Sequence, residues 1–193
     1  MSTFAYYLII INIVGFFLFL INILLYTNNY EHTVDGLLTI VSLMGGSVGI
    51  LLSMLIFDRR IVKANMMSRV FIACVFVIQV IVLLVIKGHF ADDITLAFWT
   101  FFTNHKSLIV YLVIINFIAF AAFAVDKIAA IEDRPRIRNV TLLGLAFIGG
   151  SLGALLAMYL FNHKTLKDYY TVGVPLIIIM QVIVLFYTMN ASW

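Results

Sequence analysis

Six long apolar runs, separated by short polar segments, dominate the hydropathy pattern of the chain. They cover residues 6–26, 37–57, 69–86, 108–130, 140–161 and 172–189. A helix rises about 1.5 Å per residue, so ~20 residues cross the ~30 Å hydrocarbon core of a bilayer. Membrane strands would need shorter segments that alternate polar and apolar residues. The pattern therefore predicts an all-α integral membrane protein with six transmembrane helices.

The segment between the third and fourth runs has a different pattern. It contains the nine apolar residues ITLAFWTFF, between the Asp92–Asp93 pair and Asn104. Nine residues are too few to span as a helix, and Trp99 suits a membrane interface. We expect an interfacial helix here; the alternative is the start of the fourth span. The predicted organisation is a three-helix repeat over 1–87, a connector over 88–106 and a second three-helix repeat over 107–193.

Three blocks of sequence recur in the same order, which indicates an internal duplication. YLIIINIVGF from Tyr7 matches YLVIINFIAF from Tyr111, an offset of 104 residues. MGGSVGILLSMLIF then matches IGGSLGALLAMYLF, and QVIVL from Gln79 matches QVIVL from Gln181. With three spans in each copy, the second copy would begin on the opposite side of the membrane from the first. This predicts a 3+3 inverted-topology repeat, as in several transporter folds.

The composition supports a membrane protein and sets an expected orientation. The chain is 64% hydrophobic and 11% charged, with a mean hydropathy of +1.14. Soluble domains carry about 25% charged residues. Under the inverted topology, eight basic residues lie on the side of the N-terminus and four on the other, which predicts cytoplasmic termini in a bacterial cytoplasmic membrane. Basic loops suit anionic lipid head groups as partners better than nucleic acid.

Glycines and isolated amides within the apolar runs are candidates for helix packing or for a polar path. Four-residue spacing would place small residues on one helix face and let another backbone approach. The candidate packing residues are Gly45, Gly46, Gly49, Gly149, Gly150 and Gly153. The polar candidates, which would either form interhelical hydrogen bonds or line a path, are Asn12, Ser47, Gln79, Asn116, Ser151 and Gln181.

Besides Asn116 and the glycine cluster, the second copy carries motifs at the ends of its apolar runs: Asp126, Lys127, Arg136, His163, Lys164 and Thr165. With these residues it resembles the bacterial membrane protein family known as domain of unknown function 1294. The resemblance implies a bacterial inner-membrane protein and supplies no activity. The first copy keeps the asparagine and the glycines but has Asn22 in place of Asp126, and Arg59 and Arg60 in place of His163 and Lys164.

The inverted topology makes a specific prediction about these end motifs. It places Asp126 and the His163–Lys164 pair on opposite sides of the membrane, so they cannot form one site within their own copy. It brings Asp126 towards the first copy instead. We therefore expect Asp126 to pair with Arg59 or Arg60 across the repeat interface.

The functional expectations follow from the architecture, because no catalytic motif is present. The glycine cluster lies in an apolar run, unlike a phosphate-binding loop, and neither a metal site nor a cofactor is expected. The favoured function is a small-solute or ion channel or transporter with its path at the repeat interface. The alternative is a non-transporting lipid-binding or assembly module, and a lipid-modifying enzyme is a third possibility. No ionisable residue lies near the middle of a run, which favours a passive path.

Overall fold

The computed structural model describes residues 3–27, 35–58, 66–91 and 94–191, and the regular structure in them is helical. Six helical segments in these residues are long and apolar enough to cross a membrane, which confirms the predicted all-α class. They are Thr3–Leu25, Gly36–Phe57, Met66–Ile86, Lys106–Ile131, Asn139–Leu160 and Asp168–Met189. Many large apolar side chains on these segments point outwards, among them Phe117, which is 72% exposed. Such a surface suits lipid, and the protein is a polytopic membrane protein.

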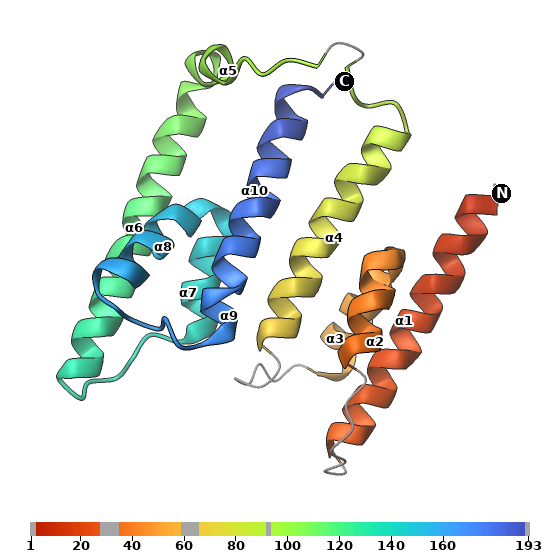
Figure 1. Cartoon of the computed structure of the whole chain (residues 1–193), viewed down its shortest axis with the longest axis horizontal. Coiled ribbons are helices and arrows are strands. Elements are labelled where there is room, and N and C mark those ends of the chain that lie inside the picture. Colours follow the sequence, from red (N-terminus) through yellow and green to blue (C-terminus); the bar gives the residue numbers. More distant parts are fainter. Residues whose placement is uncertain (1–2, 28–34, 59–65, 92–93, 192–193) are drawn as a thin grey trace. The chain divides into compact units, whose positions relative to one another are not determined.

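The chain forms two compact units, residues 1–82 and 83–193. The first contains α1 (Thr3–Thr27), α2 (Asp35–Val41), the π-helical turn η1 (Ser42–Gly46), α3 (Ser47–Phe57) and most of α4 (Met66–Ile86) (Figure 1). The second contains α5 (Phe98–Asn104), α6 (Lys106–Ile131), α7 (Asn139–Leu145), the π-helical turn η3 (Ala146–Gly150), α8 (Ser151–Leu160), α9 (Asp168–Thr171) and α10 (Gly173–Met189). The connector helix α5 is thus part of the second unit, and its Trp99 is 82% exposed.

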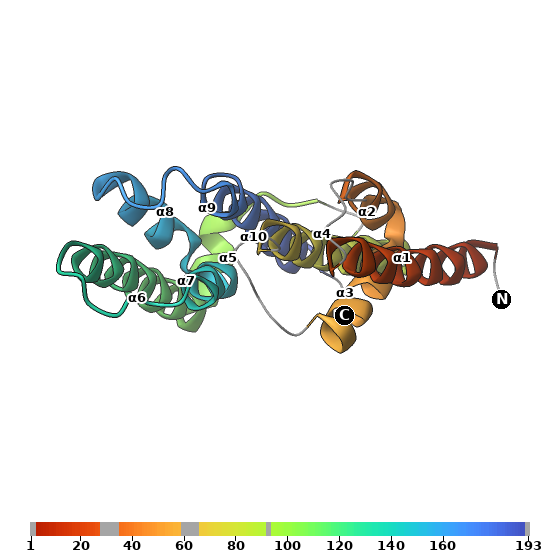
Figure 2. The ribbon, with the colours of Figure 1, turned by 90° about the horizontal axis from the view of Figure 1, so that it is seen from below.

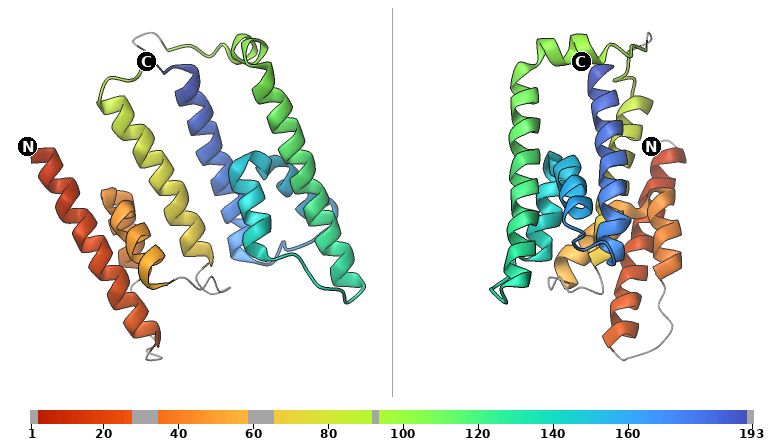
Figure 3. Two further views of the ribbon diagram at one scale, coloured as in Figure 1. Left: turned by 180° about the vertical axis from the view of Figure 1, so that it is seen from behind. Right: turned by 60° about the vertical axis from the view of Figure 1, so that its left-hand side comes forward.

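The fifth apolar run is a helical hairpin rather than one straight helix. Gly149 has a φ of +128° within η3, and the chain reverses there, so that α8 returns towards the level at which α7 began (Figures 1 and 3). The Lys164 ammonium, just beyond α8, lies 2.8 Å from the side-chain oxygen of Asn139, the first residue of α7. A straight helix of 22 residues would separate its ends by about 33 Å. The prediction of a single straight span is therefore wrong for this run.

Two names follow from this geometry. We call η3 the tip of the hairpin, and we call the end where Asn139 and Lys164 meet its base. In the second unit the hairpin lies between α6 and α10 (Figure 2), and α8 runs in the same direction as α6. The two long helices α6 and α10 therefore flank a pair of shorter ones.

The tip is stabilised by side chains that cap the broken helix. The carbonyl groups at the end of a helix lack intrahelical partners, and in apolar surroundings they need others. Gln181 donates to the carbonyls of Ala146 and Phe147, at 2.8 and 3.0 Å. Tyr111 donates to Ile148, and Asn116 donates to Gly149 at 2.9 Å. Three side chains thus donate hydrogen bonds to four consecutive carbonyls.

The same break and caps recur in the first unit. Gly45, at a φ of +111°, lies within η1. Asn12 donates to the Gly45 carbonyl at 2.9 Å, and its own oxygen accepts from the Gly49 amide at 2.8 Å. Asn116 makes the equivalent bonds to Gly149 and Gly153, at 2.9 and 2.7 Å. The correspondence between the two sequence blocks thus extends to individual hydrogen bonds.

The glycines divide between two roles because the helix is interrupted within each cluster. Gly149 supplies the positive φ, which L-residues adopt at a cost. Gly153 permits close approach, since a Cβ there would lie 2.0 Å from the Asn116 carbonyl oxygen; at Gly49 it would lie 1.9 Å from the Asn12 carbonyl oxygen. The prediction that glycines four residues apart share one continuous helix face is therefore wrong.

The second unit begins and ends at the same end of its long helices. The Thr95 amide, in the connector that leads to α6, donates to the Asn190 side-chain oxygen at 2.7 Å. The Ala91 amide donates to the Asn190 carbonyl at 2.8 Å. Asn190 directly follows α10, so the entry and the exit of this unit are neighbours. The inverted topology would place the entry and the exit of this unit at opposite ends, so the structure does not show that arrangement for the second unit.

The hairpin geometry predicts the sidedness of three positions. Reporters inserted after His89, after Asp133 and at the C-terminus should show the first and third on one side of the membrane and the second on the other. This follows because α6, 26 residues long, separates the connector from the base by about 39 Å. Opposite sides for the connector and the C-terminus would restore the inverted repeat.

Replacing Gly153 by alanine should destabilise the second unit strongly. The added methyl group would overlap the backbone of α6 at Asn116, so the two helices would have to separate. Gly144→Ala is the matched control: nothing lies within 4 Å of a Cβ there, and alanine is favoured over glycine in a helix by about 1 kcal/mol. Thermal unfolding in detergent should rank Gly153→Ala below the native chain and Gly144→Ala at or above it. Equal effects of both changes would contradict the close packing.

Candidate functional site

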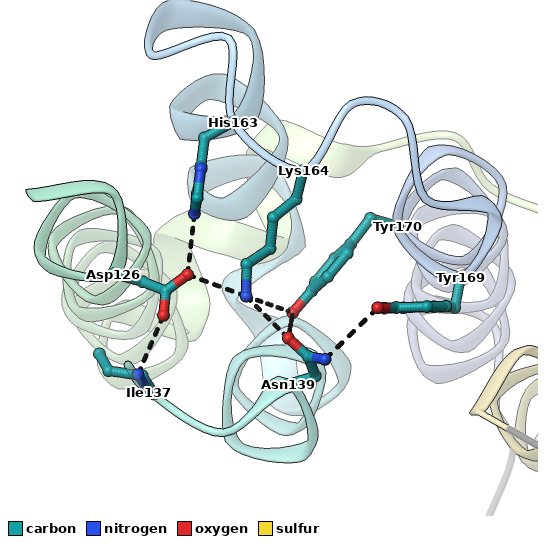
Figure 4. Close-up of polar contacts among 7 residues, drawn as sticks. All are labelled: Asp126, Ile137, Asn139, His163, Lys164, Tyr169 and Tyr170. Atoms are coloured by element: carbon teal, nitrogen blue, oxygen red, sulfur yellow. Dashed lines mark hydrogen bonds and ion pairs between the residues drawn. The ribbon is translucent and has the colours of Figure 1, made fainter. Parts of the chain in front are cut away.

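A buried carboxylate, Asp126, lies at the centre of a polar cluster at the base of the second unit (Figure 4). It projects from α6, near the end of that helix, and is 0% exposed. Its Oδ1 accepts from the Ile137 amide at 2.9 Å, and its Oδ2 lies 2.8 Å from both His163 Nε2 and Lys164 Nζ. Burying a carboxylate is costly unless it is paired and hydrogen-bonded, and Asp126 meets both conditions.

The Lys164 ammonium makes three polar contacts. Besides Asp126, it donates to the side-chain oxygen of Asn139 at 2.8 Å and to the Tyr170 hydroxyl at 3.2 Å. The Tyr170 hydroxyl in turn donates to Asn139 at 3.1 Å, which fits its role as acceptor from the lysine. An ammonium group has three N–H donors, so it can donate to all three of these oxygens.

Aromatic rings form the wall of the cluster on the side of α9. Tyr170 is fully buried and packs edge-on against Phe123 of α6, with ring centroids 5.6 Å apart. Tyr169 contacts the Tyr170 ring, and its hydroxyl accepts from the Asn139 amide at 3.3 Å. The cluster is not fully sealed, because the side chains of His163 and Lys164 are 11% and 12% exposed. Water or a small solute can therefore reach these two side chains.

The turn between α8 and α9 holds its residues in an uncommon backbone conformation. Asn162 and Lys164 have φ values of +44° and +62°. Asparagine enters this left-handed region readily, but for lysine it costs on the order of 1 kcal/mol. A hydrogen bond from His163 N to the Met158 carbonyl, at 3.0 Å, ties the turn to α8. This conformation of the turn directs the His163 imidazole and the Lys164 ammonium group towards Asp126.

The structure brings together motifs that the sequence analysis placed on opposite sides of the membrane. That expectation is wrong because the hairpin returns the chain to the base, where α6 also ends. Arg59 and Arg60 lie outside the described residues, so their pairing with Asp126 stays a prediction. Asp126 already has partners within its own unit.

The remaining end-motif residues lie outside the cluster of Figure 4. Lys127 is half-buried on α6, Arg136 is exposed in the loop before α7, and the Thr165 hydroxyl bonds to Asn162 at 3.1 Å. Among the described residues, no group of three or more His, Cys, Asp or Glu side chains is placed to hold a metal ion.

The polar candidates of the apolar runs meet within each unit, next to the π-helical turn η1 in the first unit and η3 in the second. The Ser151 hydroxyl donates to Gln181, and the Ser47 hydroxyl donates to Gln79. Together with Asn12 and Asn116 these groups form interhelical hydrogen bonds, one of the two roles considered for them. The polar path that they were also expected to line stays a prediction.

The sequence analysis missed four contributors to the cluster: Ile137, Asn139, Tyr169 and Tyr170. The Ile137 amide carries no sequence signal. Asn139 follows a basic loop and begins an apolar run, a position where asparagine often marks a helix start. The tyrosine pair begins the last apolar run, where aromatic residues also suit the membrane interface. A search for polar groups next to run ends would have found these three side chains.

The fold and the cluster define a class of polytopic membrane proteins in which a glycine-broken helical hairpin is flanked by two long helices and closed at its base by a buried ion pair. The family model described as "Protein of unknown function (DUF1294)" matches residues 116–170, from the asparagine that caps the tip to the last tyrosine of the cluster. The chain belongs to this family. It is 36% identical over 75 residues to the uncharacterized protein YsdA of Bacillus subtilis (strain 168), a match that covers 39% of this chain and 84% of YsdA. No solved structure matches the chain.

Asp126→Asn should destabilise the second unit by about 3–5 kcal/mol, because it leaves the largely buried Lys164 without its counter-charge. Combining it with Lys164→Gln should cost less than the sum of the two single changes, with a coupling of roughly 1–3 kcal/mol. The free energy of unfolding in mixed micelles is the measurement. Lys127→Gln, on the same helix, serves as the control and should be additive with Asp126→Asn.

Additivity of Asp126→Asn with Lys164→Gln would contradict the ion pair. The same cycle with Arg59→Gln or Arg60→Gln tests the cross-repeat pairing. Coupling to either arginine that exceeds the coupling to Lys164 would favour that pairing over the one in Figure 4.

Proposed function

We propose that the protein transports a small cation across a bacterial cytoplasmic membrane, with Asp126 as the group that binds the cation or a proton. The observation that carries this proposal is the fully buried carboxylate at the base of a broken helical hairpin. An ionisable residue inside a membrane-spanning segment is costly and usually marks an ion or proton pathway. The argument for a passive path was that no ionisable residue lies near the middle of a run. Asp126 lies near the end of α6 instead, but it is fully buried there, which favours a role in binding a cation or a proton.

The hairpin itself also supports transport. Non-helical backbone at membrane depth is tolerated where protein buries it or where it lines a cavity, and interrupted helices surround the substrate sites of many transporters. This support is an analogy of architecture. The proposed path follows the hairpin within the second unit, whereas the predicted path ran between the repeats.

The base cluster is better suited to rearrangement than the tip. At the tip, side chains from α6 and α10 donate to four consecutive carbonyls. Moving the tip would leave these carbonyls unpaired in apolar surroundings. At the base, His163 and Lys164 belong to a partly exposed turn and share a single carboxylate oxygen. We propose that the tip is fixed and that the turn of residues 161–167 is the part that moves.

The proposed topology follows from an even number of crossings. If each hairpin enters and leaves at one side, each unit crosses the membrane twice, and the chain returns each time to the side of the N-terminus. Ten of the twelve lysines and arginines then belong to the base side, and Lys87 and Lys106 to the other. The positive-inside rule places the base in the cytoplasm and both termini outside. This proposal replaces the inverted repeat and the cytoplasmic termini.

Lipid binding is the second candidate, favoured by the basic loop at the base. Arg134, Arg136 and Arg138 are exposed there and close to one another in sequence. Exposed arginines at a cytoplasmic membrane surface attract anionic head groups. This function requires no movement of the buried cluster, so the two candidates differ in whether Asp126 matters.

Uptake into proteoliposomes tests the proposal. With an inside-negative potential, labelled methylammonium, rubidium and sodium are offered separately. We expect at least one tracer to accumulate above protein-free liposomes and Asp126→Asn to reduce this uptake to background. Replacing Glu132, an exposed carboxylate directly after α6, by glutamine should leave uptake intact.

Two results would contradict the proposal, the first against transport itself and the second against the role of Asp126. One is no uptake of any of the three tracers by well-folded protein. The other is full uptake by Asp126→Asn, which would remove the carboxylate from the path. If uptake is absent and replacing the three arginines by glutamine abolishes retention of cardiolipin, the lipid-binding candidate is favoured instead.

A further inference from the structure

We propose that the oxygens of Asp126, Asn139 and Tyr170 form a binding site for a small ammonium-type cation, and that the Lys164 ammonium occupies this site as a tethered competitor. The inference deepens the proposed function by naming a substrate class, and its transport part rests on that function. The binding part does not, and it can be tested separately.

The contacts of Lys164 describe what the site would recognise. Its nitrogen lies 2.8 Å from Asp126 Oδ2, 2.8 Å from Asn139 Oδ1 and 3.2 Å from the Tyr170 oxygen. The three acceptors come from α6, the start of α7 and α9, so three separate segments converge on one nitrogen (Figure 4). A free ammonium ion or a primary alkylammonium can donate to the same three oxygens. The site thus fits a cation that carries N–H donors.

The aromatic wall adds a second preference for a cation of this kind. The Lys164 nitrogen lies 5.0 Å from the centroid of the Tyr170 ring. An ammonium group within about 6 Å of an aromatic centroid is attracted by the ring quadrupole, more strongly where water is excluded. Tyr170 is fully buried. The same residue thus contributes an oxygen ligand and a ring to the site.

The strained backbone of Lys164 makes its side chain easier to displace from the site. A lysine at a φ of +62° is held in a conformation that costs free energy, and backbone strain of this kind often occurs where a segment switches. The side chain extends from a turn rather than from a helix and remains 12% exposed. If the Lys164 side chain left the site, the backbone strain in the turn would be relieved and the amine would reach water.

Charge balance then requires a replacement for the departing lysine. Asp126 is 0% exposed, and an unpaired carboxylate in that position would be strongly unfavourable. The His163 imidazole stays on the same oxygen, at 2.8 Å, but it carries a positive charge only when protonated. A small ammonium-type cation in the vacated position restores both the charge and the hydrogen bonds. The lysine and the external cation thus compete for one carboxylate.

Chemical rescue of Lys164→Gly tests the site in the full-length protein. Glycine suits the positive φ, so the loss of stability should report the missing amine rather than backbone strain. Thermal unfolding in detergent is followed with methylammonium, sodium, potassium or tetramethylammonium chloride at equal ionic strength. We expect methylammonium to raise the melting temperature of Lys164→Gly well above the value in the other salts. The native protein and Lys167→Ala, an exposed lysine in the same turn, should respond equally to all four.

Two further variants determine where the cation binds. In Lys164→Gly with Asp126→Asn the carboxylate is absent, and the effect of methylammonium should disappear. In Lys164→Met an apolar side chain fills the position of the amine, so methylammonium should not raise the melting temperature of this variant. If Lys164→Gly does not fold in ordinary buffer, the yield of folded protein purified in methylammonium chloride is compared with the yield in tetramethylammonium chloride. A higher yield in methylammonium supports the site, and equal yields overturn it.

The outcomes separate this inference from the proposed function. Equal melting temperatures of Lys164→Gly in all four salts overturn the binding site, even if the native protein transports a cation. A rescue by sodium or potassium as large as that by methylammonium overturns the ammonium-type preference. Rescue without uptake of any of the three labelled cations by native protein supports the binding site and removes the transport function.

Discussion

A helix that breaks in apolar surroundings must find partners for the backbone groups it leaves unpaired, and the rest of each unit depends on how this is achieved. In the second unit, Tyr111, Asn116 and Gln181 cap the carbonyls of residues 146–149. These side chains belong to α6 and α10, so the two long helices are positioned by the same bonds that complete the tip. Gly149 permits the turn, and Gly153 lets α8 approach α6 closely enough for the caps to reach. Without the caps the reversal would leave four carbonyls without hydrogen-bond partners in apolar surroundings.

The reversal determines what meets at the base. Because α8 returns beside α6, His163 and Lys164 reach Asp126, although 37 and 38 positions separate them from it in the sequence. The first unit has the same tip but a different base: Asn22 stands in place of Asp126, and an ion pair of 2.7 Å joins Asp58, after α3, to Arg69 of α4. The tip is therefore the shared structural element of the two units, and the base is where they have diverged. Among the described residues, Asp126 is the fully buried carboxylate, so a function that depends on it belongs to the second unit.

The hydropathy pattern identified the six apolar segments correctly, because composition and length alone decide whether a helix can cross a membrane. It could not reveal the direction of the chain within residues 139–160, since the hairpin depends on the φ of one glycine and on hydrogen bonds to distant residues. Three wrong or untested predictions followed because the direction of the chain was not known. They are the inverted topology, the separation of Asp126 from His163 and the assignment of Gly45 and Gly149 to a helix face. The family motif selected Asp126, His163 and Lys164, which do form the cluster. Asn139 and Tyr170 were missed because their role depends on where the chain returns.

The return of the hairpin to its base is the central claim of this account, and a distance across it is the most direct test. Spin labels replace two exposed residues, Arg138 just before α7 and Leu166 in the turn between α8 and α9, in protein reconstituted in lipid. Pulsed electron resonance then measures the separation of the labels. A hairpin predicts a short distance, set by the direct contact between Asn139 and Lys164. A separation of about 33 Å or more, as expected for one straight helix of 22 residues, would contradict it.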